Sequence, residues 1–269
     1  MRLRRHLAAS VNAASFVAAV AVAVIVFSTG GCAAFKKSPE NVDPTLVDLV
    51  DYRNGLMMLR EGRVDEALQL LTRARTVSPN DPNVPNAMGL ALLYKKSYTA
   101  SHKAFSDALK LDPSFVEALN NRGVCLMEQG KYDEAEADFN AVLDGLPSAE
   151  KVNAHYNLGI VKKKKGLWTD AEREFSLALA DDYQYRPAYR ERGLVRIKAE
   201  KFNEALQDFL SVLKTDAKDP VANYQAALCL LATGRRDLAT RYMERAVQAA
   251  PESDEGRKAK RFLDTEPRS

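Results

Sequence analysis

The chain has few of the residues that usually carry chemistry. Its 269 residues include three cysteines, three histidines and one tryptophan. His102 and His155 have no cysteine, aspartate or glutamate at the sequence spacing of a metal site, and His6 lies close to the first residue. No glycine-rich phosphate-binding loop is present. We therefore expect a protein that is not an enzyme and has no metal, no cofactor and no small-molecule substrate.

Charge of one sign is also lacking. The chain has 39 basic and 36 acidic residues, a net charge of +3. Arg2, Arg4 and Arg5 account for this excess of positive charge. Without its first 31 residues the chain has 36 basic and 36 acidic residues. A neutral chain has no global field that attracts nucleic acid, so we expect no nucleic-acid partner.

The sequence has no long hydrophobic run. The apolar stretch from Phe16 to Phe27 has 12 residues, whereas a helix that spans a membrane needs about 20. Arginines precede this stretch, and the small residues of STGG follow it, directly before Cys32. This order is typical of an export signal. We predict that residues 1–31 are a cleaved signal peptide; ordinary secretion after cleavage at a small residue is the alternative to lipidation.

Cys32 resembles the lipidated cysteine of bacterial lipoproteins, whose thiol is acylated and which becomes the new N-terminus. The small residues before it fit this pattern, and Thr29 departs from the leucine that is usual there. The resemblance implies a covalent lipid on Cys32 as the membrane anchor, in which each buried CH₂ contributes about 0.8 kcal/mol. Ala33 in place of an aspartate favours, by analogy, the outer membrane, with the protein facing the periplasm. Residues 32–43 are predicted to be a flexible tether.

What the chain has in abundance is periodicity. A small residue returns every 34 residues, except for one step of 36 residues between Gly123 and Gly159. Another small residue follows 12 positions later and a large apolar one four further on, as in Gly89, Ser101 and Phe105. A repeat of this length is one supersecondary unit that cannot bury its apolar face alone, so the units must stack. The first small residues are Gly55, Gly89, Gly123, Gly159, Gly193 and Ala227.

Each unit reads as two antiparallel helices. Apolar residues recur at helical spacing in both halves, a glycine such as Gly62 separates the halves, and a proline such as Pro79 ends most units. This set resembles the tetratricopeptide repeat, which implies an all-α fold: a right-handed superhelical α-solenoid of six repeats with a C-terminal capping helix. The repeat domain is predicted at 44–252, with units 48–81, 82–115, 116–149, 152–185, 186–219 and 220–252.

The open end of the last repeat needs a cover. Residues 253–264 are predicted to be a short capping helix, because solenoids require a polar cap for solubility. The run Lys162–Lys165 and the basic residues of the cap are expected to be solvated faces. Those cap residues are Arg257, Lys258, Lys260 and Arg261.

Three other residue environments follow from the repeat register. Phe139 is expected in the core, and Glu172 on the exposed side of its helix. Cys125 and Cys229 hold the same place in units three repeats apart. Neighbouring helices are about 8–10 Å apart, so these cysteines lie beyond the roughly 7 Å that a disulfide bridges. They are interpreted as small buried apolar residues.

The binding surface is expected along the first helix of each repeat, which lines the concave side of such stacks. The ninth position of the unit is apolar in all six repeats, unlike the asparagine usual in repeat domains that clamp peptide carboxylates. Lys163 and Arg190 interrupt the apolar stripe later, so we expect the partner on the first three repeats. An amphipathic helix or an extended apolar segment suits such a groove. The predicted partner-binding residues are Tyr52, Leu56, Leu59, Asn86, Leu90, Leu93, Asn120, Val124 and Met127.

The third and fourth repeats carry the sharpest family resemblance. LNNRGVCLMEQGKYDEAEADFNAVL runs from Leu119 to Leu143, and after a longer loop NLGIVKKKKGLWTDAEREFSLAL runs from Asn157 to Leu179. With the lipoprotein signal and six repeats, this resembles the pilotin lipoproteins of type IV pili (the PilW, PilF and Tgl type). The resemblance implies an outer-membrane lipoprotein that binds the pilus secretin and helps it assemble. A lipoprotein adaptor for outer-membrane protein assembly or murein remodelling, and a scaffold without a dedicated membrane partner, are the alternatives.

Overall fold

The computed structural model describes residues 44–145 and 151–265. The predicted signal peptide, Cys32, the tether and most of the longer loop before Asn157 lie outside these residues. Within the described ranges the chain forms 13 α-helices and no strand. None of the helices described is long and apolar enough to cross a membrane. The chain divides after Gly145 into two compact units.

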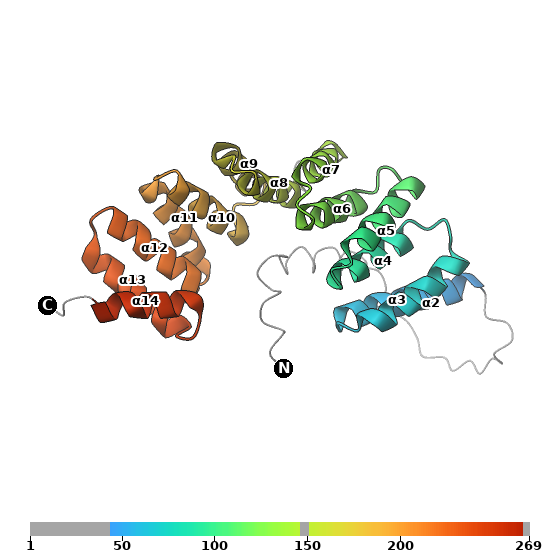
Figure 1. Ribbon diagram of the computed structural model, residues 1–269, viewed down its shortest axis with the longest axis horizontal. Coiled ribbons are helices and arrows are strands. Elements are labelled where there is room, and N and C mark those ends of the chain that lie inside the picture. Colours follow the sequence, from blue (N-terminus) through green and yellow to red (C-terminus); the bar gives the residue numbers. More distant parts are fainter. Residues whose placement is uncertain (1–43, 146–150, 266–269) are drawn as a thin grey trace, which may run out of the picture. The chain divides into compact units, whose positions relative to one another are not determined.

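The first unit consists of three helical hairpins (Figure 1). We call the first helix of each hairpin the A helix and the second the B helix. Each A helix packs on its own B helix, each B helix contacts the next A helix, and successive A helices also contact each other. The hairpins are α2 (Pro44–Arg60) with α3 (Val64–Val77), α4 (Asn83–Tyr94) with α5 (Tyr98–Leu111), and α6 (Val116–Glu128) with α7 (Tyr132–Gly145).

The second unit repeats this arrangement and adds a cap. Its last helix packs on α13 and α12, with Phe262 and Leu263 against the core, so the predicted capping helix is confirmed. The hairpins are α8 (Val152–Lys164) with α9 (Trp168–Asp181), α10 (Arg186–Lys198) with α11 (Phe202–Thr215), and α12 (Pro220–Ala232) with α13 (Arg236–Ala249), followed by α14 (Asp254–Thr265).

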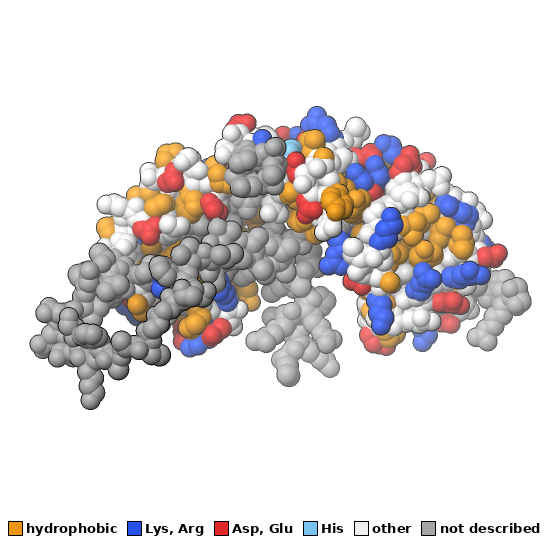
Figure 2. Space-filling view, turned by 180° about the vertical axis from the view of Figure 1, so that it is seen from behind, with side chains coloured by type: hydrophobic (Ala, Val, Ile, Leu, Met, Phe, Trp, Pro, Cys, Tyr) orange, Lys and Arg blue, Asp and Glu red, His pale blue; other side chains and the backbone are white. Residues whose placement is uncertain are grey.

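Charged side chains of both signs are interspersed on the face that Figure 2 displays. The four basic residues predicted to be solvated in the cap are all exposed. One of them, Lys258, donates to Asp254 at 2.6 Å within the same helix. These charged groups agree with the predicted cap, because they give the end of the stack a polar surface.

The turn between the two helices of a hairpin requires a left-handed residue. Four of the six turns use glycine there, with φ between 74° and 76°. Lys96 and Glu200 adopt the same conformation, with φ of 59° and 57°. A side chain makes this conformation costly, which explains why the sequence marks the turn with glycine in most repeats. The glycines are Gly62, Gly130, Gly166 and Gly234.

The first small residue of each repeat makes room for a large side chain of the same hairpin. A Cβ atom on Gly89 would lie 2.5 Å from the ring of Phe105, which is closer than carbon atoms approach in proteins. Three other hairpins have the same glycine–phenylalanine pair, with a fully buried ring, and one of these rings is Phe139, as predicted. The last hairpin combines Ala227 with the flexible Met243. The A-helix backbone therefore serves as the floor on which the B-helix ring packs.

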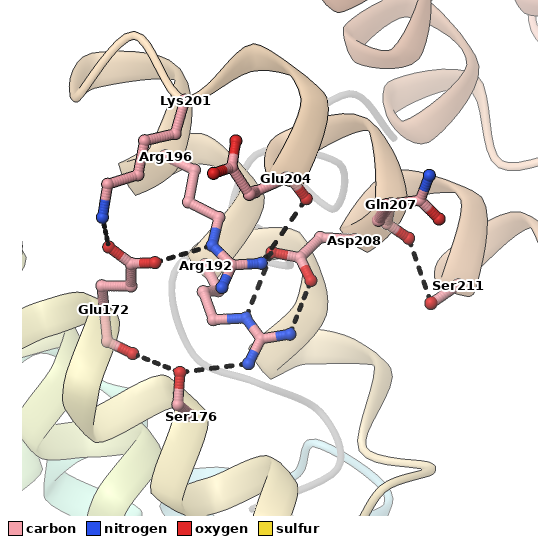
Figure 3. Close-up of polar contacts among 9 residues, drawn as sticks. All are labelled: Glu172, Ser176, Arg192, Arg196, Lys201, Glu204, Gln207, Asp208 and Ser211. Atoms are coloured by element: carbon pink, nitrogen blue, oxygen red, sulfur yellow. Dashed lines mark hydrogen bonds and ion pairs between the residues drawn. The ribbon is translucent and has the colours of Figure 1, made fainter.

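In each unit a buried ion pair joins the two helices of one hairpin, and its arginine also contacts a serine of the preceding hairpin. The guanidinium of Arg192 on α10 donates to both carboxylate oxygens of Asp208, at 3.1 and 2.7 Å, and to Ser176 Oγ on α9 at 3.0 Å (Figure 3). Asp208 is 2% exposed. In the first unit Arg122 makes the same bidentate contact with Asp138, at 2.8 and 2.7 Å. It also donates to Ser106 on the preceding B helix. Two-pronged arginine–carboxylate contacts fix the relative orientation of the helices that carry them.

Glu172 extends this network, and its predicted exposure is wrong. Its carboxylate accepts from Arg196 Nε at 2.8 Å and from Lys201 Nζ at 2.7 Å, and Arg196 also donates to Asp208 at 2.8 Å (Figure 3). Burial acts to raise the pKa of Glu172, but the hydrogen bonds from Lys201 and Arg196 outweigh it and hold that pKa below its usual value of 4.5. The residue therefore stabilises the contact between two hairpins.

We predict that Gly89→Ala lowers the free energy of unfolding by about 1–3 kcal/mol, because the added methyl group overpacks against the Phe105 ring. Urea denaturation measures the loss. The matched control is the same change in a Phe105→Met background, which imitates the Ala227–Met243 hairpin. There the cost of Gly89→Ala should shrink, and an equal cost in both backgrounds would contradict the close approach.

We predict that Glu172→Gln lowers stability at neutral pH by about 1 kcal/mol, since a carboxylate with charged donors is lost. A carboxyl whose pKa is lowered in the folded state contributes stability above its unfolded pKa and loses it as pH falls through the folded pKa. The difference between wild type and variant should therefore vanish as the pH is lowered below about 4.5. Glu244→Gln, an exposed change on α13, should stay within about 0.5 kcal/mol throughout. A difference for Glu172→Gln that is independent of pH would contradict this assignment.

Candidate functional site

The A helices of the first unit carry a row of half-buried apolar side chains. Because successive A helices contact one another, residues at equivalent positions of the repeat lie in register along them. Each residue of the row keeps part of its surface exposed. We call this row the A-helix stripe. It comprises Leu56 on α2, Leu90 and Leu93 on α4, and Val124 and Met127 on α6.

Leu59, predicted to belong to this surface, is instead part of the core. Only 4% of its surface is exposed, and it packs in a cluster with Val64, Ala67 and Leu71. It lies three residues after Leu56 on nearly the same face of α2, but side chains of α3 cover it in the first hairpin. Prediction of Leu59 as a binding residue is therefore wrong.

The polar residues predicted at the rim of the stripe are also half-buried. Asn86 accepts a hydrogen bond from Asn121 Nδ2 at 3.1 Å, which links α6 to α4. The prediction did not include Asn121, although it stands directly beside Asn120 in the sequence. Burial and the nearby Asp81 carboxylate raise the pKa of Tyr52 to about 12, so its hydroxyl stays protonated. The rim thus offers amide and phenol groups next to an apolar row.

The two cations expected to interrupt the stripe in the second unit are both neutralised. Lys163 Nζ donates to Glu191, and Arg190 donates to Asp219. Asp219 also accepts from the Ala222 backbone N–H at 2.9 Å and caps α12. The A helices of the two units therefore differ less in net charge than the sequence suggests, because both cations are paired with carboxylates.

A pocket that sequence reasoning missed lies in the second unit. Its volume is about 450 Å³. Leu194 and Ile197, two of its lining residues, hold the repeat positions that Leu56 and Leu59 hold in the first unit, and Trp168, the only tryptophan of the chain, completes the apolar lining. The apolar residues at these repeat positions could have predicted the pocket, but the charged residues near them in the sequence argued against an apolar surface. The other lining residues are Lys163, Lys164, Lys198 and Gln225.

Neither the histidines nor the cysteines of the described chain form a reactive centre. His155 Nδ1 lies 2.9 Å from Glu174 Oε2 on the facing helix, a contact that the sequence spacing did not reveal. No group of three potential ligands that could hold a metal ion occurs among the described residues. Cys125 and Cys229 are buried and not in a disulfide, as predicted, and burial raises the pKa of both thiols. These thiols are therefore protonated core groups.

Two segments match known repeat models. Residues 86–150 and residues 196–261 each match a model described as tetratricopeptide repeat. Among curated proteins, the chain is 24% identical over 183 residues to the tetratricopeptide repeat and J domain-containing co-chaperone DNJ1 of Cryptococcus neoformans, covering 66% of this chain and 30% of that one. It is 27% identical over 121 residues to human RNA polymerase II-associated protein 3, covering 45% and 18%. The chain therefore spans a third or less of the length of these relatives.

Solved structures resemble the chain over a larger share. A structure of PilF from Pseudomonas aeruginosa gives a TM-score of 0.71 at 19% identity, covering 81% of this chain and 99% of that one. A structure of PilW, a widely conserved type IV pilus biogenesis factor, gives 0.72 at 20% identity, covering 79% and 97%. At this identity the likeness establishes the fold. Residues 86–150 and 196–261 thus consist of tetratricopeptide repeats, and the chain has the all-α fold of such repeats, which is generally a non-enzymatic scaffold for protein–protein interaction.

Proposed function

We propose that the protein is an outer-membrane lipoprotein that acts as a pilotin, binding the type IV pilus secretin and assisting its assembly. The observation that carries this proposal is the fold likeness to PilF and PilW, which extends over 97–99% of those two chains. PilW is a pilus biogenesis factor. A likeness that spans nearly the whole of those chains supports a related role more than a match to isolated repeats does.

The A-helix stripe supplies the surface for the client. A peptide helix or strand with apolar residues on one side could bury Leu90 and Val124 further while its backbone meets the amides of Asn86 and Asn120. Burial of apolar area gives about 25 cal/mol for each Å², so a few half-buried leucines provide affinity without a charged contact. Apolar rows with polar rims are a common mode of helix or strand recognition. The secretin segment that binds here should therefore be apolar and amphipathic.

The anchor in this proposal is the acylated Cys32, which holds the repeats next to the membrane in which the secretin assembles. The small residues before Cys32 and the arginines and apolar stretch further upstream support it. Acyl chains on one cysteine anchor a protein stably when several act together. The repeats would then stay on the periplasmic side.

We predict that Cys32→Ala releases the protein from the membrane fraction or leaves it unprocessed, because the anchoring chains are lost. Fractionation of outer membrane, inner membrane and soluble material is the measurement, with Cys125→Ala as the matched cysteine control. A Cys32→Ala protein that stays firmly in the outer membrane would contradict the anchor while leaving the secretin proposal open to its own test.

We predict that Leu90→Asp with Val124→Asp abolishes secretin assembly, because two carboxylates in the stripe oppose apolar docking. Secretin multimers in membranes are the readout. The control is Val77→Asp with Leu111→Asp, two exposed positions on the B helices α3 and α5 of the same unit.

Circular dichroism and membrane fractionation establish that both double variants fold and localise as wild type does. The control variant should assemble secretin normally. Normal assembly with the folded Leu90→Asp, Val124→Asp protein would place secretin binding on another surface.

A further inference from the structure

The pocket of the second unit combines an apolar floor with an exposed tryptophan. Leu194 and Ile197 on α10 form the floor, and Trp168, the first residue of α9, stands beside it with 40% of its surface exposed. Large aromatic side chains are seldom left exposed next to an apolar pocket without a partner, and tryptophan is enriched at the centres of interfaces. The network of Arg192 with Asp208 holds α10 in place, so the floor is preformed.

Two lysines at the edge of this pocket have no carboxylate partner among the described residues. Lys164 ends α8 and Lys198 ends α10, and both are exposed pocket-lining residues without an ion pair in that part of the chain. Lys163, which lines the same pocket, is satisfied by Glu191. These two exposed lysines therefore line the apolar pocket without an ion pair among the described residues, where an outside anion can reach them.

Helix geometry explains only part of this arrangement. A lysine in the last turn of a helix interacts favourably with the helix dipole, which accounts for Lys164 and Lys198 as cations. The dipole gives no reason for an apolar pocket of about 450 Å³ or for an exposed tryptophan in its lining. A flat anionic membrane would meet the lysines but would leave the apolar pocket unfilled. A protruding side chain with acidic neighbours satisfies all three features.

We propose that this pocket is a second binding site, specific for an acidic segment of a partner protein that inserts an apolar side chain between Trp168, Leu194 and Ile197. Carboxylates on either side of that side chain pair with Lys164 and Lys198. This site is separate from the A-helix stripe, whose rim is uncharged, and it does not depend on the pilotin role. The two units thus take ligands that differ in charge: an apolar, uncharged segment in the first and an apolar, acidic segment in the second.

Fluorescence titration tests the site directly, because Trp168 is the only tryptophan in the chain. The probe is a short amidated peptide with leucines on one side and glutamates on the other, and the comparison peptides replace each glutamate by glutamine or by lysine. The glutamate peptide should change the Trp168 emission and bind about tenfold or more tightly than the glutamine peptide, with affinity that falls as salt is added. The lysine peptide should not bind.

Charge reversal on the protein gives the matched comparison. Lys164→Glu with Lys198→Glu should weaken the glutamate peptide by about tenfold or more. Lys214→Glu, which changes an exposed lysine in the last turn of the B helix α11, should leave affinity unchanged. All three lysines are exposed, so the variants should fold as wild type does in circular dichroism.

Several results would overturn the proposal. They are equal affinity for the glutamate and glutamine peptides, an equal effect of Lys214→Glu, and binding of anionic phospholipid vesicles with no response to any peptide. Peptide binding that occurs only in a chain lacking residues 1–43 would also overturn it, because the pocket would then belong to the chain's own N-terminal segment.

Discussion

The close contact between a glycine of the A helix and a phenyl ring of the B helix is the constraint on which four of the six described hairpins depend. At Gly89 the ring of Phe105 occupies the space that a methyl group would need. The ring can be fully buried only because the A-helix backbone is bare there, so the two positions must change together. Ala227 with Met243 is the variation that this constraint permits, since a flexible side chain can yield to a methyl group. Because a contact of this kind recurs once in each repeat, its residues recur about every 34 positions in the sequence.

Once the hairpins are formed, polar contacts set how they stack. Arg122 with Asp138 and Arg192 with Asp208 lie at equivalent places in alternate repeats and reach back to the preceding B helix through a serine. Breaking one partner of such a buried pair leaves an uncompensated charge, so these pairs restrict the orientation of the helices more than they add net stability. The half-buried positions of the A-helix stripe keep part of their surface outside these contacts. Those positions carry the surfaces that we assign to partners.

The fold was accessible from the sequence because its information is local and periodic. The turn glycines, the glycine–phenylalanine spacing, the buried cysteines and the polar cap all follow from repeat position. The residues that were misjudged depend on which neighbour a side chain meets across hairpins. Leu59 packs in the core, and Glu172 accepts hydrogen bonds from Arg196 and Lys201 of the next repeat. The arginine–aspartate spacing of 16 residues in two repeats was readable, whereas the pocket beside Trp168 arises from four helices, and only its apolar repeat positions Leu194 and Ile197 left a signal in the sequence.

The central claim is that the apolar A-helix face of the first unit docks the secretin. Site-specific photo-crosslinking tests it most directly, with a photoreactive side chain placed at Leu90 on the A helix α4 or at Leu111 at the end of the B helix α5. The account predicts a covalent adduct with the secretin from Leu90 and none from Leu111. An adduct from Leu111 alone, or equal adducts from both positions, would contradict it.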